Sequence, residues 1–197
     1  MGRQSDAKQR ILDSALNLMG ERGYTDVGVE AIMQAAKVGK GSFYHFFKSK
    51  EVLGEAVMEE YSRRFEQEVV NEAFSPAYDP LEHPLRLITV ITAQLQKQDP
   101  VLGCLAANCC AEGAGVPEEM RKKAAETLEL VERKLSASFR LAVAEMDLLP
   151  DTPIEELAGA CLAYVHGLFL LSKAKRSPDP MTRLGPLITH IWKPYLA

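Results

Sequence analysis

Apolar residues recur every three or four positions along nearly the whole chain, which is the period of an amphipathic helix. The longest run follows GAGVP at 113–117 and predicts one very long helix. Its apolar positions are Met120, Ala124, Leu128, Val131, Leu135, Phe139, Ala142 and Met146. Almost no segment alternates with the period of two that a half-buried strand requires. The pattern therefore predicts an all-α fold.

Breaks rich in glycine and proline divide the chain into about nine helices. Gly23 is expected to end the first helix. Ser49 is expected to cap a long helix whose apolar positions step by four from Leu53 to Val69. The later breaks are SPAYDPLEHP at 75–84, DPVLG at 99–103, LLPDTP at 148–153 and SPDP at 177–180. The last helix is expected around 184–192, and the chain shows no internal repeat.

Two of the predicted helices are short, at about 29–36 and 40–46, and the glycine-containing stretch AAKVGKG at 35–41 joins them. Two short helices with a tight turn are typical of a helix-turn-helix, whose second helix enters the major groove of DNA. Phe43 and either Phe46 or Phe47 would hold this helix from inside. The exposed side would carry Lys40, Ser42, Tyr44 and His45.

Two further residues extend this predicted DNA-contacting set. Gly41 has no side chain, so the first turn of the recognition helix can approach DNA closely. Lys50 lies in the first turn of the next helix, where free N–H groups already favour a phosphate. We therefore expect residues 1–50 to bind DNA and residues 51–197 to bind a ligand and dimerise.

Charge is distributed unevenly between these two parts. Residues 1–50 carry eight Lys/Arg and five Asp/Glu, a net charge of +3. The whole chain carries 23 and 27, so residues 51–197 carry 15 and 22, a net charge of −7. A basic end on an acidic body favours an anionic partner for that end alone, although chance fluctuation is the simpler alternative.

The sequence around the predicted helix-turn-helix resembles the DNA-binding domain of the TetR family of transcriptional repressors. The similar stretches are GYTDVGVEAI at 23–32 and KGSFYHFFKSKEVL at 40–53. VGV at 27–29 and GCLAANCCAE at 103–112 are more similar to the NemR-like branch, which senses electrophiles and related small molecules. The resemblance implies a repressor that a small-molecule inducer releases from its operator.

A homodimer is expected on physical grounds as well as from the resemblance. One three-helix reader covers few base pairs, and two-fold pairing fits a near-palindromic operator of double-stranded DNA. The last two helices could form a four-helix bundle across the dimer axis. The residues expected at this seam are Gly159, Gly167, Leu168, Ile188, Ile191 and Trp192.

Three positions depart from the family pattern. Val27 stands where the family often has threonine, and Gly28 stands where serine often caps the second helix. We therefore expect a weak cap there and one fewer backbone contact to DNA. Lys37 replaces the usual glycine of the turn and is expected to need a positive φ, at a modest cost in strain.

The thiols and one histidine are the candidate effector residues. The cysteines are Cys104, Cys109, Cys110 and Cys161, and no C-x-x-C pair occurs among them. Cys104 matches the place of the reactive sensor in the NemR-like branch, and a helix N-terminus there would favour its thiolate. The alternative is a buried, inert thiol, which we expect for the other three cysteines. His166 would either line a pocket or satisfy a bond in the core.

Other function classes find little support in the sequence. No nucleophile elbow, zincin or kinase motif occurs, so neither an enzyme nor a cofactor is expected. Cys104 and Cys109 point to different faces of a helix, which disfavours a metal site. The polar N-terminus and the lack of an apolar run of about 18 residues favour a cytoplasmic protein without a membrane contact. A helical ligand-binding protein that does not bind DNA remains the alternative from another class.

Overall fold

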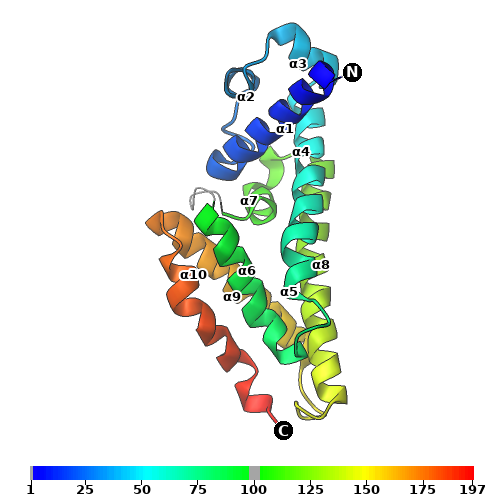
Figure 1. Cartoon of the computed structure of the whole chain (residues 1–197), viewed down its shortest axis with the longest axis vertical. Coiled ribbons are helices and arrows are strands. Elements are labelled where there is room, and N and C mark those ends of the chain that lie inside the picture. Colours follow the sequence, from blue (N-terminus) through cyan, green and yellow to red (C-terminus); the bar gives the residue numbers. More distant parts are fainter. Residues whose placement is uncertain (1, 98–102) are drawn as a thin grey trace. The chain divides into compact units, whose positions relative to one another are not determined.

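The computed structural model describes residues 2–97 and 103–197, which form helices joined by short loops (Figure 1). The helices are α1 Gly2–Arg22, α2 Val29–Ala36, α3 Lys40–Phe46, α4 Lys50–Phe65, α5 Asn71–Ala73, α6 His83–Lys97, α7 Leu105–Glu112, α8 Glu118–Ala144, α9 Ile154–Lys175 and α10 Asp179–Leu184. The described residues contain no strand, only an isolated bridge between Leu148 and Leu196. The predicted all-α class is confirmed.

Two of the predicted helix boundaries are held as the sequence indicates. Gly23 follows the last residue of α1 with φ 87°, a conformation that a glycine adopts without strain. The Ser49 hydroxyl accepts the backbone N–H of Val52 at 3.3 Å and so caps the start of α4. Of the predicted break at 99–103, only Gly103 lies within the described residues.

The helix that begins at Lys50 is interrupted earlier than the sequence indicates. α4 ends at Phe65, a π-helical turn spans Glu66–Val70, and the three-residue α5 follows. A π turn inserts one extra residue into the helical register. The neighbouring residues Val69 and Val70 at the end of this turn are both buried.

The last predicted helix begins and ends differently. α10 starts at Asp179 inside the predicted SPDP break, because a proline at the first turn of a helix loses no hydrogen bond. A 3-10 segment, η4, then spans Gly185–Ile191 and carries Pro186 in its own first turn. The expected α-helix around 184–192 is therefore wrong in its type and its start.

The chain divides into two compact units. The first contains the residues up to Arg64 together with Cys104–Thr127, so α7 and the beginning of α8 pack with α1 to α4. The second contains the described residues of 65–103 together with Leu128–Ala197. These packing units cut the sequence differently from the expected functional division at residue 50, which remains a prediction.

In the second unit, α10 and η4 pack on both α6 and α9, and Figure 1 shows α10 beside these two helices. Ile188 is fully buried and Trp192 is 4% exposed, and the Trp192 ring packs 5.8 Å from that of Phe139. Leu168 is also buried. The expectation that Leu168, Ile188 and Trp192 face a second subunit is wrong, because they form the core of their own chain.

One described helix, α9, is long and apolar enough to cross a membrane, with a mean hydropathy of 1.4 over an 18-residue window. This differs from the expectation that no such run exists. One face of α9 lies in the core of the second unit, through Leu157, Ala158, Cys161, Val165, Leu168, Phe169 and Ser172. Its opposite face, which carries the exposed Leu170 and Leu171, is also apolar, and this accounts for the high hydropathy of α9.

Candidate nucleic-acid interface

α2 and α3 are joined by a turn whose geometry follows from Lys37. Lys37 adopts φ 53° and ψ 47°, and its N–H donates to the Gln34 carbonyl at 3.2 Å. The positive φ expected for this residue is confirmed, and it directs the chain from α2 into α3. Gly28 caps α2 in an extended conformation without a side-chain hydrogen bond, as expected for a weak cap.

The inward side of α3 is aromatic. Phe43 is fully buried and Phe47 is 2% exposed, and their ring centroids lie 6.2 Å apart. Phe46 is only half-buried, with the ring of His45 edge-on at 4.8 Å. Phe43 and Phe47, rather than Phe46, therefore hold α3 on its unit.

The outward side of α3 carries the predicted contact residues. Lys40, Gly41 and His45 are exposed, Tyr44 is 45% exposed, and Ser42 is half-buried. A Cβ added at Gly41 would meet no atom within 4 Å. The helix thus presents a cation, a hydroxyl, an aromatic ring and an open backbone to a partner.

Lys50 lies apart from this set, against the turn between α1 and α2. Its ammonium is 4.3 Å from the ring centroid of Tyr24 and donates to the Thr25 carbonyl at 3.3 Å. Burial, followed by the charges of three nearby glutamates, raises the pKa of Tyr24 to about 12, so its hydroxyl stays neutral. An ammonium has three N–H donors, so these contacts leave Lys50 able to reach a phosphate.

Sequence reasoning missed the partner of this turn on α7. The carboxylate of Glu112 accepts hydrogen bonds from the backbone N–H of Tyr24 and from the N–H and hydroxyl of Thr25. These residues are 87 or 88 positions apart in the chain. No local pattern could have revealed the contact, since only the tertiary fold brings them together.

Cys104 forms the N-cap of α7. Its sulfur accepts the N–H of Ala107 at 3.5 Å and the hydroxyl of Tyr61 at 3.3 Å. Burial raises the pKa of Tyr61 well above its ordinary value, and the neighbouring Cys104 adds to this effect, so the tyrosine remains a donor. In the sequence, Tyr61 is one of the positions that step by four from Leu53 to Val69, and this pattern indicated only a buried residue. Cys104 itself is 4% exposed, so a reagent has little access to its sulfur in this conformation.

The remaining thiols differ in exposure. Cys109 and Cys161 are buried, and burial raises the pKa of each to about 12, which keeps them protonated at neutral pH. Cys110 is exposed, although partial burial raises its pKa as well. The expectation of a buried, inert thiol thus agrees with the surroundings of Cys109 and Cys161 and does not agree with the exposure of Cys110.

His166 is half-buried on α9. Its Nδ1 donates to the carbonyl of Leu162, one turn earlier in the same helix, at 2.9 Å. Its ring lies 6.2 Å from that of Phe169. The local bond suits the expected structural alternative, while a role in lining a ligand pocket remains a prediction.

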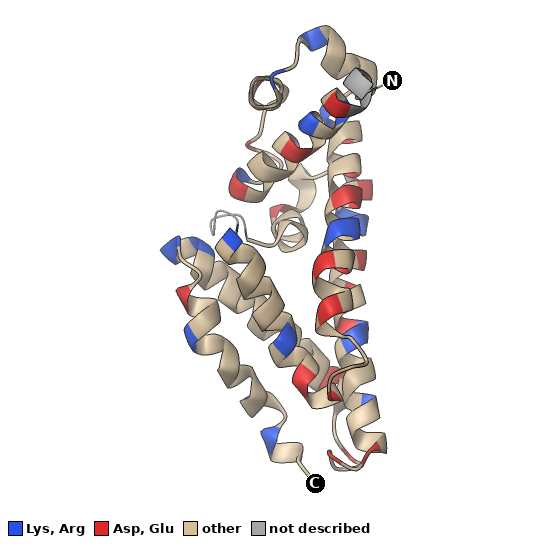
Figure 2. Cartoon of the chain, viewed as in Figure 1, with Lys and Arg blue, Asp and Glu red and all other residues tan. Residues whose placement is uncertain are grey.

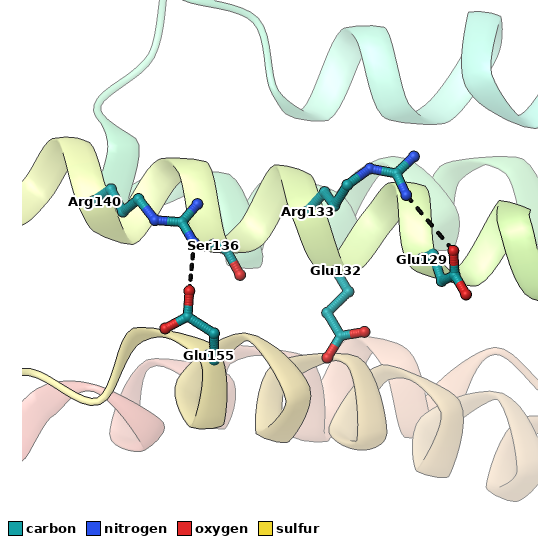
Figure 3. Close-up of a pocket in the computed structure, with 6 residues that line it drawn as sticks. All are labelled: Glu129, Glu132, Arg133, Ser136, Arg140 and Glu155. Atoms are coloured by element: carbon teal, nitrogen blue, oxygen red, sulfur yellow. Dashed lines mark hydrogen bonds and ion pairs between the residues drawn. The ribbon is translucent and has the colours of Figure 1, made fainter.

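A groove of about 360 Å³ runs between α8 and α9 in the second unit (Figure 3). The residues that line it are Glu129, Glu132, Arg133, Ser136, Arg140 and Glu155. Arg140 pairs with Glu155 across the groove, and Arg133 pairs with Glu129 at 3.7 Å along α8. Ligand pockets are lined mainly by apolar side chains, so this charged and open groove is a poor candidate for the effector site.

Comparison with known proteins supports the resemblance over nearly the whole chain. Residues 11–57 match the model of bacterial regulatory proteins of the tetR family, and residues 80–186 match that of the tetracyclin repressor-like C-terminal domain. The transcriptional regulator AcuR of Cereibacter sphaeroides is 33% identical over 177 residues, which cover 89% of this chain and 80% of AcuR.

The expected assignment to the NemR-like branch is not shown by these comparisons and remains a proposal. The transcriptional repressor NemR of Escherichia coli is 29% identical over 118 residues, which cover 60% of this chain and 59% of NemR. The crystal structure of a regulatory protein TetR from Rhodobacter sphaeroides superimposes with a TM-score of 0.86 at 28% identity. That match covers 94% of this chain and 98% of the other.

Proposed function

Because the chain belongs to the TetR family of bacterial regulatory proteins, we propose that α3 reads an operator and that a small molecule acting near Cys104 releases it. Members of this family are transcription regulators rather than enzymes, and ligand-responsive repression is typical of them. Family membership favours this function over the helical protein without DNA binding that the sequence left open. The bacterial cytoplasm, where the DNA lies, is the proposed place of action.

The exposed side of α3 is the observation that carries the DNA-reading part. Its inward rings are buried while Lys40, Tyr44 and His45 project outward, which is the arrangement a recognition helix needs. Lys40 can donate to base acceptors or to phosphates, and the other two can donate or accept. Ser42, Gly41 and Lys50 complete the proposed contact set.

Single substitutions test this assignment directly. Lys40→Ala and Tyr44→Ala are each expected to weaken operator binding by about 1–3 kcal/mol while circular dichroism stays unchanged, because both side chains are exposed. Lys50→Ala should weaken binding to all sequences alike. It should also flatten the slope of log K against log salt by about one unit for each phosphate that Lys50 no longer neutralises.

The matched control is Lys134→Ala, which removes an exposed positive charge from α8 in the second unit. It should bind DNA like the parent chain. Equal affinity of the parent, Lys40→Ala and Tyr44→Ala would remove α3 from the proposed role. If Lys134→Ala weakened DNA binding as much as Lys40→Ala, the loss of affinity would reflect the change in net charge and not a contact made by α3.

Covalent sensing at Cys104 is a second candidate, favoured by the two donors that converge on its sulfur. A thiolate there would add to the β-carbon of an α,β-unsaturated carbonyl. The C–S bond forms, the C=C electron pair moves to the carbonyl oxygen, and the α-carbon then takes a proton from water. Leu105 and Ala106 beside it are buried, so the adduct would displace α7.

The covalent and non-covalent candidates separate in a Cys110→Ser background, which removes the exposed thiol. After treatment with a small maleimide, loss of operator binding should track the mass of the Cys104 adduct. The same protein with Cys104→Ser should keep its DNA affinity after treatment. If maleimide still released the operator from the variant with Cys104→Ser, covalent sensing at Cys104 would be ruled out, and the non-covalent inducer would be the remaining candidate.

A further inference from the structure

The turn between α1 and α2 encloses a carboxylate from a distant helix. Oε1 of Glu112 accepts the Tyr24 N–H at 2.9 Å, and Oε2 accepts the N–H and hydroxyl of Thr25 at 2.8 and 2.6 Å. Successive N–H groups that converge in this way form a concave anion site. A Cβ at Gly23 would lie 2.5 Å from Oε1, so only glycine leaves room for the carboxylate.

The same turn is held on its other side by α4. Lys50 donates to the Thr25 carbonyl, while Glu112 accepts from the N–H of the same residue. The Tyr24 ring packs directly on Gly54, where an added Cβ would lie 2.7 Å from the ring. An anion and a cation thus fix the two ends of one residue, and an aromatic ring fixes the turn against α4.

This turn determines where the helix-turn-helix begins. Val27 is buried and its N–H donates to the Tyr24 carbonyl at 3.3 Å, and α2 starts two residues later at Val29. α2 and α3 follow with one short turn between them. A displacement of Thr25 is therefore passed to α2 and α3 with little chain in between to absorb it.

α7 connects this turn to Cys104. The helix is eight residues long, about 12 Å, with Cys104 as its N-cap and Glu112 as its last residue. The Asn108 side chain, midway along, donates to the Gly20 carbonyl at the end of α1 at 3.4 Å. A rigid helix of this length transmits a shift at one end to the other.

We propose that Glu112 is a positioning residue for operator binding: its carboxylate locks the Tyr24–Thr25 turn to α7 and so sets the orientation of α2 and α3. The inference rests on the proposed DNA-reading role of α3 and deepens it. Glu112 itself touches no DNA. It acts through the turn, and a shift of α7 releases the operator by withdrawing the carboxylate.

Glu112→Gln tests the lock without removing volume. An amide nitrogen cannot accept hydrogen bonds, so at least one of the donors at Tyr24 and Thr25 loses its acceptor. Operator affinity should fall about tenfold, as expected for loss of a bond to a charged group. The salt slope should stay the same, because no phosphate contact is removed. Amide hydrogen exchange at Tyr24 and Thr25 should rise about tenfold without DNA.

Two variants complete the design. Thr25→Val removes only the hydroxyl bond and is expected to reduce affinity by a smaller factor in the same direction. The double variant should lose less than the product of the two single effects, because both residues belong to one network. Glu119→Gln is the matched control, since it removes an exposed carboxylate from α8 in the same unit.

The outcomes decide between positioning and plain stability. The proposal would be overturned if Glu112→Gln and Thr25→Val bound the operator as tightly as the parent, whatever their melting temperatures. It would also be overturned if Glu119→Gln lost as much operator affinity as Glu112→Gln. If Glu112→Gln fails to fold, Thr25→Val decides by the same measure. If the parent chain selects no DNA at all, the proposed function fails. If amide exchange at Tyr24 and Thr25 is unchanged in the variants, the proposed contact between Glu112 and this turn fails, whatever the outcome for DNA binding.

Discussion

A substitution at Gly41 should affect the stability of the fold and the binding of DNA in opposite directions. A Cβ there meets no atom of the protein, so Gly41→Ala should stabilise the fold by about 0.5–1 kcal/mol through better helix propensity. If the first turn of α3 lies against a phosphate, the added methyl should weaken operator binding by roughly tenfold, about 1.4 kcal/mol. Thermal unfolding and fluorescence anisotropy measure the two effects on one sample. Higher stability with unchanged affinity would mean that DNA does not approach Gly41.

Single residues also show how far sequence reasoning reaches. The positive φ of Lys37 and the buried Phe43 follow from local patterns, which act within a few positions of the chain. The bonds from Tyr61 to Cys104 and from Thr25 to Glu112 do not follow from such patterns, because each pair is joined only by the tertiary fold. The candidate contact residues on α3 could be proposed from the sequence because they follow from local patterns. The contact of Glu112 with the Tyr24–Thr25 turn could not, because it depends on the tertiary fold.

At the scale of elements, an ion-pair cluster fastens α4 to α1. Glu60 accepts from Arg63 at 2.8 Å and from Arg64 at 2.6 Å, and Arg64 also reaches Asp13 on α1 at 2.6 Å. The bond from Arg63, followed by those from Arg64 and opposed by burial, lowers the pKa of Glu60 to about 2. Glu60 therefore stabilises the fold above its ordinary pKa of 4.5, and this contribution is lost as pH falls toward 2.

Glu60→Gln should therefore lower the free energy of unfolding at pH 7 by about 1–2 kcal/mol, after allowance for solvent screening. The difference from the parent should shrink steadily between pH 5 and about pH 3. Urea titrations across this range measure it. The exposed neighbour Glu59, changed to Gln, is the control and should have little effect at any pH. A difference that does not vary with pH would show that the charge of Glu60 is not what stabilises the pair of helices.

The elements themselves were largely predictable, because each long helix carries its own apolar period. The exceptions were places where the period alone is ambiguous. A π turn at Glu66–Val70 interrupts the helix that the apolar period continues to Val69, and proline at the first turn lets α10 begin inside a predicted break. The seam assigned to Ile188 and Trp192 failed because an apolar stripe does not reveal whether it faces its own chain or a second one.

For the whole molecule, we propose a dimer contact other than the one expected from the sequence. Exposed apolar residues gather on α9, α10 and η4, and Figure 2 shows η4 without either charge colour. They are Leu170, Leu171, Leu184 and Leu187. Gly167 is exposed on α9 one turn before Leu170 and Leu171, so the three lie on one face. An apolar face of this kind on a family of dimeric regulators is the expected seam.

Leu170→Glu and Leu187→Glu should each place a charge in this seam, at a cost of several kcal/mol to the dimer. Light scattering should then show monomers at micromolar concentration, with reduced operator affinity. Leu141→Glu on α8 is the control, since it makes the same change at another exposed leucine. A stable dimer in both seam variants would place the contact elsewhere.

Operator reading by α3 is tested most simply by selecting bound sequences from random double-stranded DNA with the purified chain. We expect enrichment of one near-palindromic sequence, with two half-sites about one helical turn or a multiple of it apart. The Lys40→Ala/Tyr44→Ala double variant should lose that enrichment while retaining its helicity and its dimeric state. No enriched sequence for the parent, or the same one for the double variant, would contradict the claim that α3 reads an operator.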